Sequence, residues 1–109
     1  MELKDGILKI YPLAETEINK LIAIAEIVEF PKQTTFIAQN TTNKYIYFLE
    51  KGICRIYYPK QDKEVILDFC FPGNIILPLN SYVYGKPTYE IVDSITGCTV
   101  HRISIVKLP

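Results

Sequence analysis

Apolar and polar residues alternate along the chain in two successive patterns, first that of a helix and then that of strands. Between positions 12 and 25 the apolar residues recur every three or four residues, which places them on one face of a helix. These residues are Ile18, Leu21, Ile22 and Ala25. Pro12 suits the entry of a helix, and acidic residues follow in the first turn. We therefore predict a helix over about residues 12–25.

From Ile27 onward the pattern becomes that of short strands separated by turn residues. The turn signals are residues 40–43, Gly52, Gln61-Asp62, Gly73, Gly85 and Gly97. The main strands predicted between them are residues 34–38, 45–49, 53–58, 65–71, 75–79, 89–94 and 99–105. Many short strands at even spacing predict a sandwich or barrel. We expect a mainly β fold, in which one helix precedes an antiparallel β-roll of jelly-roll type over about residues 27–106.

The clearest local signal surrounds Glu50-Lys51-Gly52. Runs of β-branched and aromatic residues stand on both sides of it, starting at Tyr45 and ending at Tyr58. Glycine accepts a left-handed backbone more easily than other residues, and short loops of this kind join paired strands. The pattern predicts an antiparallel hairpin.

Length and charge narrow the class of protein. A chain of 109 residues indicates one domain, residues 1–109, with a modest core. Twelve basic and twelve acidic side chains cancel, whereas a free-standing nucleic-acid binder usually has a basic excess. No apolar run reaches the length of a membrane span, and the amino terminus has no signal-peptide pattern. We expect a cytoplasmic protein that does not enter a membrane.

The cysteines Cys54, Cys70 and Cys98 are odd in number and widely spaced. Without a Cys-x-x-Cys pair they argue against a disulfide framework and against a zinc site. All three stand in strand-like apolar surroundings, so we predict buried reduced thiols. A role in sensing oxygen or nitric oxide stays open as the alternative.

Residue patterns typical of enzymes are missing. His101 is the only histidine, whereas the metal site of a cupin-type enzyme needs several. No second histidine could complete a Ser/His/Asp or Cys/His pairing, and no glycine-rich phosphate loop occurs. The tyrosines lack an accompanying basic cluster, so they indicate strand packing rather than stacking on bases. We expect no enzymatic activity, no metal and no cofactor.

Several segments follow the order and spacing of a known family. They are residues 30–34, 45–57 and 63–69 and Pro72-Gly73-Asn74. From about Tyr11 to its end the chain resembles the sensor half of Crp/Fnr-type bacterial transcription regulators, which share the cyclic-nucleotide-binding β-roll. Asn80-Ser81-Tyr82 and residues 85–88 resemble the branch of that family common in Bacteroidetes.

In that family the roll is followed by a dimerisation helix and a helix-turn-helix that reads operator DNA. Both would lie beyond Pro109, so the resemblance implies that this chain lacks them. It also implies a homodimer for the full-length protein and DNA contact only through the missing domain. The sequence stops abruptly at Leu108-Pro109 after an apolar strand pattern, and we expect it to be a fragment of a longer protein.

The resemblance fails at the cassette with which the family holds the cyclic phosphate. The family carries a Gly-Glu-Leu element there and, several positions later, an arginine beside a small hydroxyl residue. Arginine supplies a fixed cation whose fork geometry fits a phosphate. Here Leu77-Pro78-Leu79 stands at the first element, no arginine lies near Thr88, and Glu90 would repel a phosphate. We do not expect cyclic AMP to bind in the usual mode.

The stretch from Phe69 through Gly85 carries no charged residue, which favours a pocket for a neutral or apolar small-molecule effector. The candidate lining residues are Leu77, Leu79, Asn80, Ser81, Tyr82, Lys86, Thr88 and Tyr89. Lys86 is the nearby cation of this set, though a flexible point charge replaces an arginine fork poorly. The alternative is that these residues only pack the roll and a short cassette helix.

Two functions follow from these observations. The first is the effector-sensing domain of a Crp/Fnr-like regulator, in which a ligand biases the helix expected after Ile105. The second is a stand-alone β-roll that acts as a structural or protein-interaction module without a small ligand.

Overall fold

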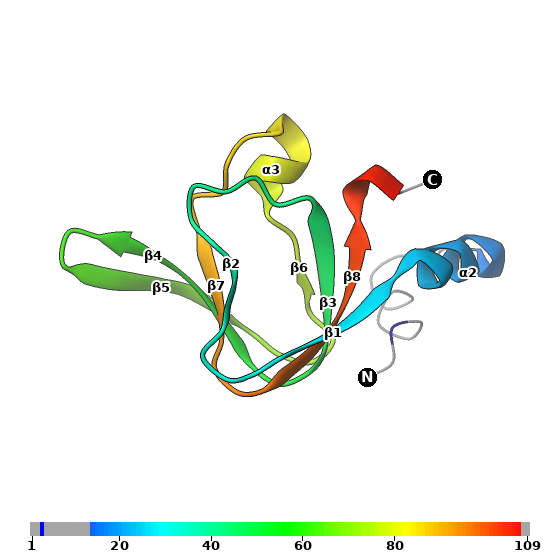
Figure 1. The fold of residues 1–109 in the computed structure, drawn as a ribbon, viewed down its shortest axis with the longest axis horizontal. Coiled ribbons are helices and arrows are strands. Elements are labelled where there is room, and N and C mark those ends of the chain that lie inside the picture. The colour runs from blue at the N-terminus through cyan, green and yellow to red at the C-terminus, as the bar shows by residue number, and fades with distance from the viewer. Residues whose placement is uncertain (1–2, 4–13, 108–109) are drawn as a thin grey trace.

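Two four-stranded antiparallel sheets face each other and form a roll (Figure 1). The structure is a computed structural model that describes residue 3 and residues 14–107. The first sheet has the order β1-β8-β3-β6, formed by Glu26–Phe30, Cys98–Ser104, Tyr45–Lys51 and Ile75–Ile76. The second has the order β2-β7-β4-β5, formed by Thr35–Ile37, Ile91–Ser94, Cys54–Lys60 and Lys63–Cys70.

Strands that follow one another in the chain lie in different sheets, with one exception. Among the described strands, only β4 and β5 are both consecutive and in the same sheet. This repeated crossing between two antiparallel sheets is the arrangement of a jelly roll. The predicted mainly β jelly-roll fold with a preceding helix is confirmed.

The predicted hairpin around Glu50-Lys51-Gly52 is wrong. β3 pairs with β6 and β8, whereas β4 pairs with β5 and β7. The segment between them is a corner at the base of the roll, drawn at the bottom of Figure 1. Gly52 has a φ of 96°, and a Cβ there would lie 2.6 Å from the Cys98 Sγ and 2.9 Å from the Cys98 Cα. The glycine therefore permits close approach of two corners rather than a hairpin turn.

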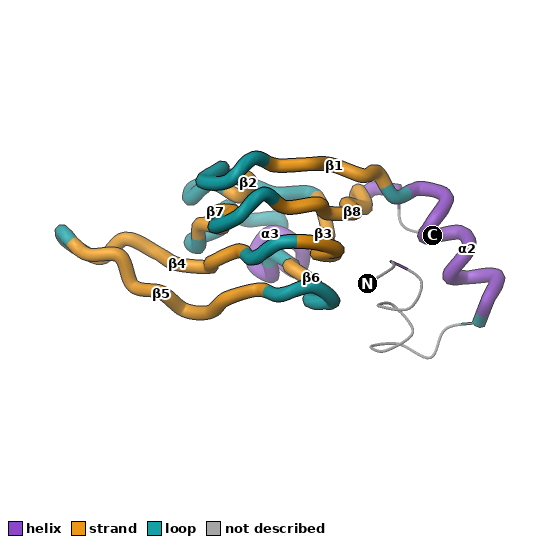
Figure 2. Tube along the Cα trace, turned by 90° about the horizontal axis from the view of Figure 1, so that it is seen from below, coloured by secondary structure: helices purple, strands orange, loops and turns teal. Residues whose placement is uncertain are grey.

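The hairpin of this region joins β4 to β5 instead. Lys60 and Lys63 are register partners, so the loop is Gln61-Asp62, where Gln61 has a φ of 59°. A two-residue loop with positive φ matches the twist of paired strands. This hairpin projects away from the roll (Figures 1 and 2).

The apolar run over residues 75–79 was expected to be a strand and is one only in part. β6 ends at Ile76, and a short helix, α3, occupies Leu79–Tyr84. Pro78 precedes this helix in an extended conformation, with φ −72° and ψ 90°. A short apolar run does not by itself distinguish a strand from a buried helix start.

The main core lies between the two sheets. Its buried residues are Ile37, Tyr47, Leu49, Cys54, Cys70, Ile76, Val92, Cys98 and Val100. Leu49 and Val100 are register partners on β3 and β8, and both are 0% exposed. Alternate residues of these strands point to opposite faces, so Phe48 leaves this core for the outer face of the first sheet.

The helix α2 packs on that outer face. It spans Glu15–Ile24, which confirms the predicted helix, and no side chain caps it at Ala14. Ile18 is buried together with Leu3 and Phe48. Pro12, predicted at the entry of the helix, lies outside the described residues.

The described chain ends in a single turn of 3-10 helix, η1, at Ile105–Lys107. Among the described residues, no helix is both long enough and apolar enough to cross a membrane.

Candidate functional site

A cavity of about 310 Å³ lies beside α3, the short helix drawn at the top of Figure 1. It is bounded by the end of β6, by α3 and by the segment that leads into β7. The lining residues are Leu77, Leu79, Asn80, Tyr84, Thr88, Tyr89 and Glu90. A smaller cavity of about 20 Å³ shares Leu77, Thr88 and Glu90 with it and extends to the core residues Ile37 and Val92.

Most of the predicted pocket residues meet at this cavity. Those that line it are Leu77, Leu79, Asn80, Thr88 and Tyr89. The other predicted residues are Ser81, which is buried, and Tyr82 and Lys86, which are exposed, and these three do not line it.

Ser81 holds the segment after α3 in place. Its hydroxyl donates to the Lys86 carbonyl oxygen at 2.7 Å and accepts the Asn43 backbone N–H at 3.1 Å. Both capacities of the hydroxyl are therefore used inside the chain, and Ser81 positions the cavity wall instead of facing a ligand.

The wall of the cavity is fixed by further local bonds. Gly85 ends α3 with a φ of 64°, a left-handed C-terminal conformation that glycine adopts easily. The Asn80 side chain donates through Nδ2 to the Pro87 carbonyl oxygen at 3.0 Å. The Thr88 backbone N–H donates to the Thr41 carbonyl oxygen at 2.8 Å, and the Thr88 hydroxyl donates to the Glu90 carbonyl oxygen at 3.3 Å.

Two lining residues were missing from the predicted set, Tyr84 and Glu90. Tyr84 stands four residues after Asn80, so helical spacing places both on one face once α3 is known to be a helix. From the sequence, Glu90 is expected to repel a phosphate, but it is not among the predicted lining residues. Its place in the cavity depends on the path of the chain into β7, which no local pattern encodes.

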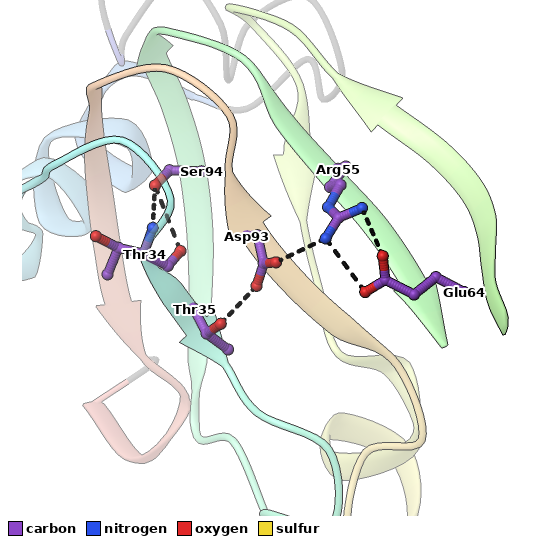
Figure 3. Close-up of polar contacts among 6 residues, drawn as sticks. All are labelled: Thr34, Thr35, Arg55, Glu64, Asp93 and Ser94. Carbon is purple, nitrogen blue, oxygen red and sulfur yellow. Dashed lines mark hydrogen bonds and ion pairs between the residues drawn. The ribbon is translucent and has the colours of Figure 1, made fainter. Parts of the chain in front are cut away.

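Neither arginine of the chain reaches this cavity. Arg55 is held on the face of β4 opposite the core (Figure 3), where its guanidinium donates to Glu64 and Asp93, each at 3.3 Å. Burial opposes the charge of Arg55, yet the hydrogen bonds that its guanidinium donates to Asp93 and Glu64 outweigh this effect and raise the pKa of the guanidinium. Arg102 on β8 donates to Glu26 at 3.0 Å.

A second and larger cavity, of about 510 Å³, lies against this arginine and is lined by Gln33, Arg55, Asp93, Ser94 and Ile95. The charged side chains of this lining, Arg55 and Asp93, are already paired (Figure 3). The Thr35 hydroxyl donates to Asp93 at 2.6 Å, and the Thr34 backbone N–H donates to the Ser94 hydroxyl at 2.9 Å. No unsatisfied charge is left in it for a ligand to meet.

The cysteines converge at the base of the roll. The Cys54 and Cys98 Sγ atoms are 3.6 Å apart, and Cys70 is the register partner of Cys54. All three are buried, as predicted. Burial raises the pKa of Cys70 to about 11, and it also raises the pKa of Cys54. Among the described residues, no group of three or more His, Cys, Asp or Glu side chains could hold a metal ion.

His101 lies on β8, and the polar atoms of its ring are only partly satisfied. Its Nε2 lies 3.3 Å from a Glu50 carboxylate oxygen but has no partner with hydrogen-bond geometry. The ring contacts Phe48, with centroids 6.2 Å apart.

The family model for the cyclic nucleotide-binding domain matches residues 27–108. This match covers most of the chain, which therefore belongs to the cyclic nucleotide-binding domain family. A search of the curated proteins found no match.

Solved structures share the fold at low sequence identity. The regulatory domain of Toxoplasma gondii PKA with cAMP has a TM-score of 0.89 and 17% identity, over 96% of this chain and 41% of that chain. The sensor domain of the transcriptional regulator DNR from Pseudomonas aeruginosa has a TM-score of 0.81 and 17% identity, over 94% of this chain and 68% of that one. The Thermus thermophilus catabolite activator protein has a TM-score of 0.80 and 13% identity, over 94% and 47%.

This chain thus spans less than half the length of two of these structures. Since the identities are low, the likeness establishes the fold alone.

Proposed function

We propose that this chain is the effector-sensing domain of a Crp/Fnr-like transcription regulator of the Bacteroidetes branch. Its effector is a small molecule other than cyclic AMP in the usual binding mode. One observation carries this proposal: the cavity beside α3 is lined by a carboxylate, Glu90, and by no arginine. The family match and the shared fold of DNR and the catabolite activator protein support the regulatory part.

The electrostatic reason is direct. A cyclic phosphate that leaves water needs a fixed cation and several hydrogen-bond donors in return. The cavity offers a carboxylate instead, and Pro78 supplies no backbone N–H at the start of α3. An anion would lose its hydration there without gaining a charged partner.

Transmission would run from this cavity to the end of the roll. A ligand that contacts α3 and Tyr89 differently in two conformations shifts the balance between them. In the full-length protein that balance sets the position of a dimerisation helix after η1, and with it the paired DNA-binding domains of a homodimer. The domain itself acts by binding, without catalysis, in the cytoplasm.

Thermal-shift measurements with the purified chain test this function. Cyclic AMP and a set of small metabolites are each added, and the melting temperature is recorded. We expect no saturable shift with cyclic AMP and a saturable shift with at least one metabolite.

A matched pair of variants locates the effect. Leu79→Trp fills the cavity and abolishes the metabolite shift, whereas Val83→Trp on the same helix, exposed and outside the lining, preserves it. Saturable cyclic AMP binding, or a metabolite shift that survives in Leu79→Trp, would overturn the proposal.

The second candidate is a stand-alone interaction module. One observation favours it: the outer edge strand β5 and the residue after it expose Ile66, Leu67, Phe69 and Phe71, an apolar strip of the kind that contacts partners. The reading frame of the gene decides between the two candidates. A helix-turn-helix encoded after Pro109 supports the sensor, and a stop codon there supports the module.

A further inference from the structure

Glu90 brings a solvent-exposed carboxylate to the wall of the cavity. It is the charged residue among those that line it. Among the described residues, no lysine, arginine or histidine forms an ion pair with its carboxylate. Lys86, four positions earlier, is exposed and stands outside the lining.

Two tyrosine rings line the same cavity as the Glu90 carboxylate. Tyr84 and Tyr89 both line the cavity. The Tyr58 ring, on β4, lies 5.3 Å from the Tyr89 ring, centroid to centroid. A tyrosine face attracts a cation within about 6 Å of its centroid, most strongly where water is partly excluded.

Elsewhere in the chain the same combination of tyrosine and carboxylate is completed by a cation. Arg55 lies 4.0 Å over the Tyr57 ring and is paired with Asp93 and Glu64. Arg102 lies 4.4 Å over the Tyr45 ring and is paired with Glu26. The cavity beside α3 has the tyrosines and the carboxylate but no cation of the chain.

We propose that the missing cation is the ligand, a small ammonium ion that carries hydrocarbon groups. Its charge faces Glu90, its polarised methyl or methylene groups lie against Tyr84 and Tyr89, and Leu77 and Leu79 cover its apolar part. A volume of about 310 Å³ suits a molecule of this size. The inference rests on the proposed function, because it names the effector class of the same cavity.

The test compares two molecules of nearly equal shape. Choline carries a quaternary nitrogen, and 3,3-dimethyl-1-butanol carries a carbon atom at the same place. Isothermal titration calorimetry of the full 109-residue chain is run with each of them and with cyclic AMP. We expect saturable binding of choline, at least tenfold tighter than that of its neutral counterpart.

Two matched pairs of variants identify the binding groups. Glu90→Gln weakens choline binding about tenfold, whereas Glu29→Gln, an exposed carboxylate on β1, leaves it unchanged. Tyr89→Leu weakens it about fivefold, whereas Tyr82→Leu on the outer side of α3 does not. Melting temperatures recorded in parallel confirm that each variant is folded.

The outcomes separate this inference from the proposed function. If choline and 3,3-dimethyl-1-butanol bind with equal affinity, the inference that the effector is a cation is wrong. The cavity would then bind a neutral effector, and the proposed function would stand. The absence of saturable choline binding, or full binding in Glu90→Gln, also overturns the inference, while the metabolite screen still decides the proposed function. If cyclic AMP binds and displaces choline, both the inference of an ammonium effector and the proposed function are wrong.

Discussion

The two ends of the roll differ in how tightly their residues pack. At the base, the corner around Gly52 approaches Cys98 so closely that no side chain fits between them. At the other end, α3 exposes large apolar side chains such as Leu79, 62% exposed, and Tyr84, 70% exposed. Figure 1 shows the two ends at the bottom and the top of the roll.

The difference separates a densely packed end of the roll from an end that contains a cavity. The base is closed by contacts that tolerate almost no added volume, since protein interiors are as dense as organic crystals. The α3 end keeps a cavity and a helix of six residues without a side-chain cap. Such a segment opens at low cost, which is usual for elements that admit ligands.

The largest expected effect contrasts the two positive-φ glycines of these ends. Gly52→Ala places a methyl group against Gly97 and Cys98, so we expect a loss of about 3–5 kcal/mol in the free energy of unfolding. Gly85→Ala meets nothing within 4 Å and carries only the strain of its φ, about 1 kcal/mol. Urea denaturation of both variants measures the difference, and equal losses would contradict the comparison.

The next contrast concerns two leucines. Leu49→Ala, at a fully buried core position, is expected to cost about 3 kcal/mol through lost burial and the cavity left behind. Leu79→Ala changes stability by less than about 0.5 kcal/mol because its side chain is mostly exposed. Thermal denaturation reports both values. A large loss in Leu79→Ala would mean that α3 supports the core more than its exposure indicates.

The sequence predicted the elements well and their partners badly. Residues 45–49 and 53–58 were identified as strands, and both are. Their pairing was not, because a hairpin and a corner between two sheets begin with the same residue pattern. What separates them is the contact of Gly52 with Cys98, 46 positions later in the chain, and contacts at that separation leave no local periodicity.

The same limit applies to the candidate site. Leu77, Leu79 and Asn80 were predictable because they lie in an uncharged stretch that stands out against the composition of the chain. Thr88 and Tyr89 were predictable because they stand where the family resemblance places the second phosphate-binding element. Ser81 was assigned to the pocket because its hydroxyl resembles a ligand contact in sequence. Its partners, Asn43 and Lys86, use that hydroxyl inside the fold instead.

The smallest expected effect is a pH dependence that arises at the base. Burial raises the pKa of Cys70 to about 11 from an ordinary value of 9.0, so the folded state favours the neutral thiol. The stability this confers is fully present below about pH 9 and is lost as the pH rises through about 11, in total about 2 kcal/mol. Unfolding free energies measured by urea denaturation between about pH 8 and 11 should therefore fall.

Cys70→Ala separates this titration from the general alkaline destabilisation of the fold. The variant is less stable at neutral pH, because it loses buried volume, but its stability should fall less steeply with pH than that of the wild type. The thiols at the base are distant in sequence and adjacent in space, so their titration reports on closure of that end alone. If the two pH profiles are parallel, Cys70 is as accessible to solvent in the folded state as in the unfolded state, and the contrast between a closed base and an open top does not hold at this position.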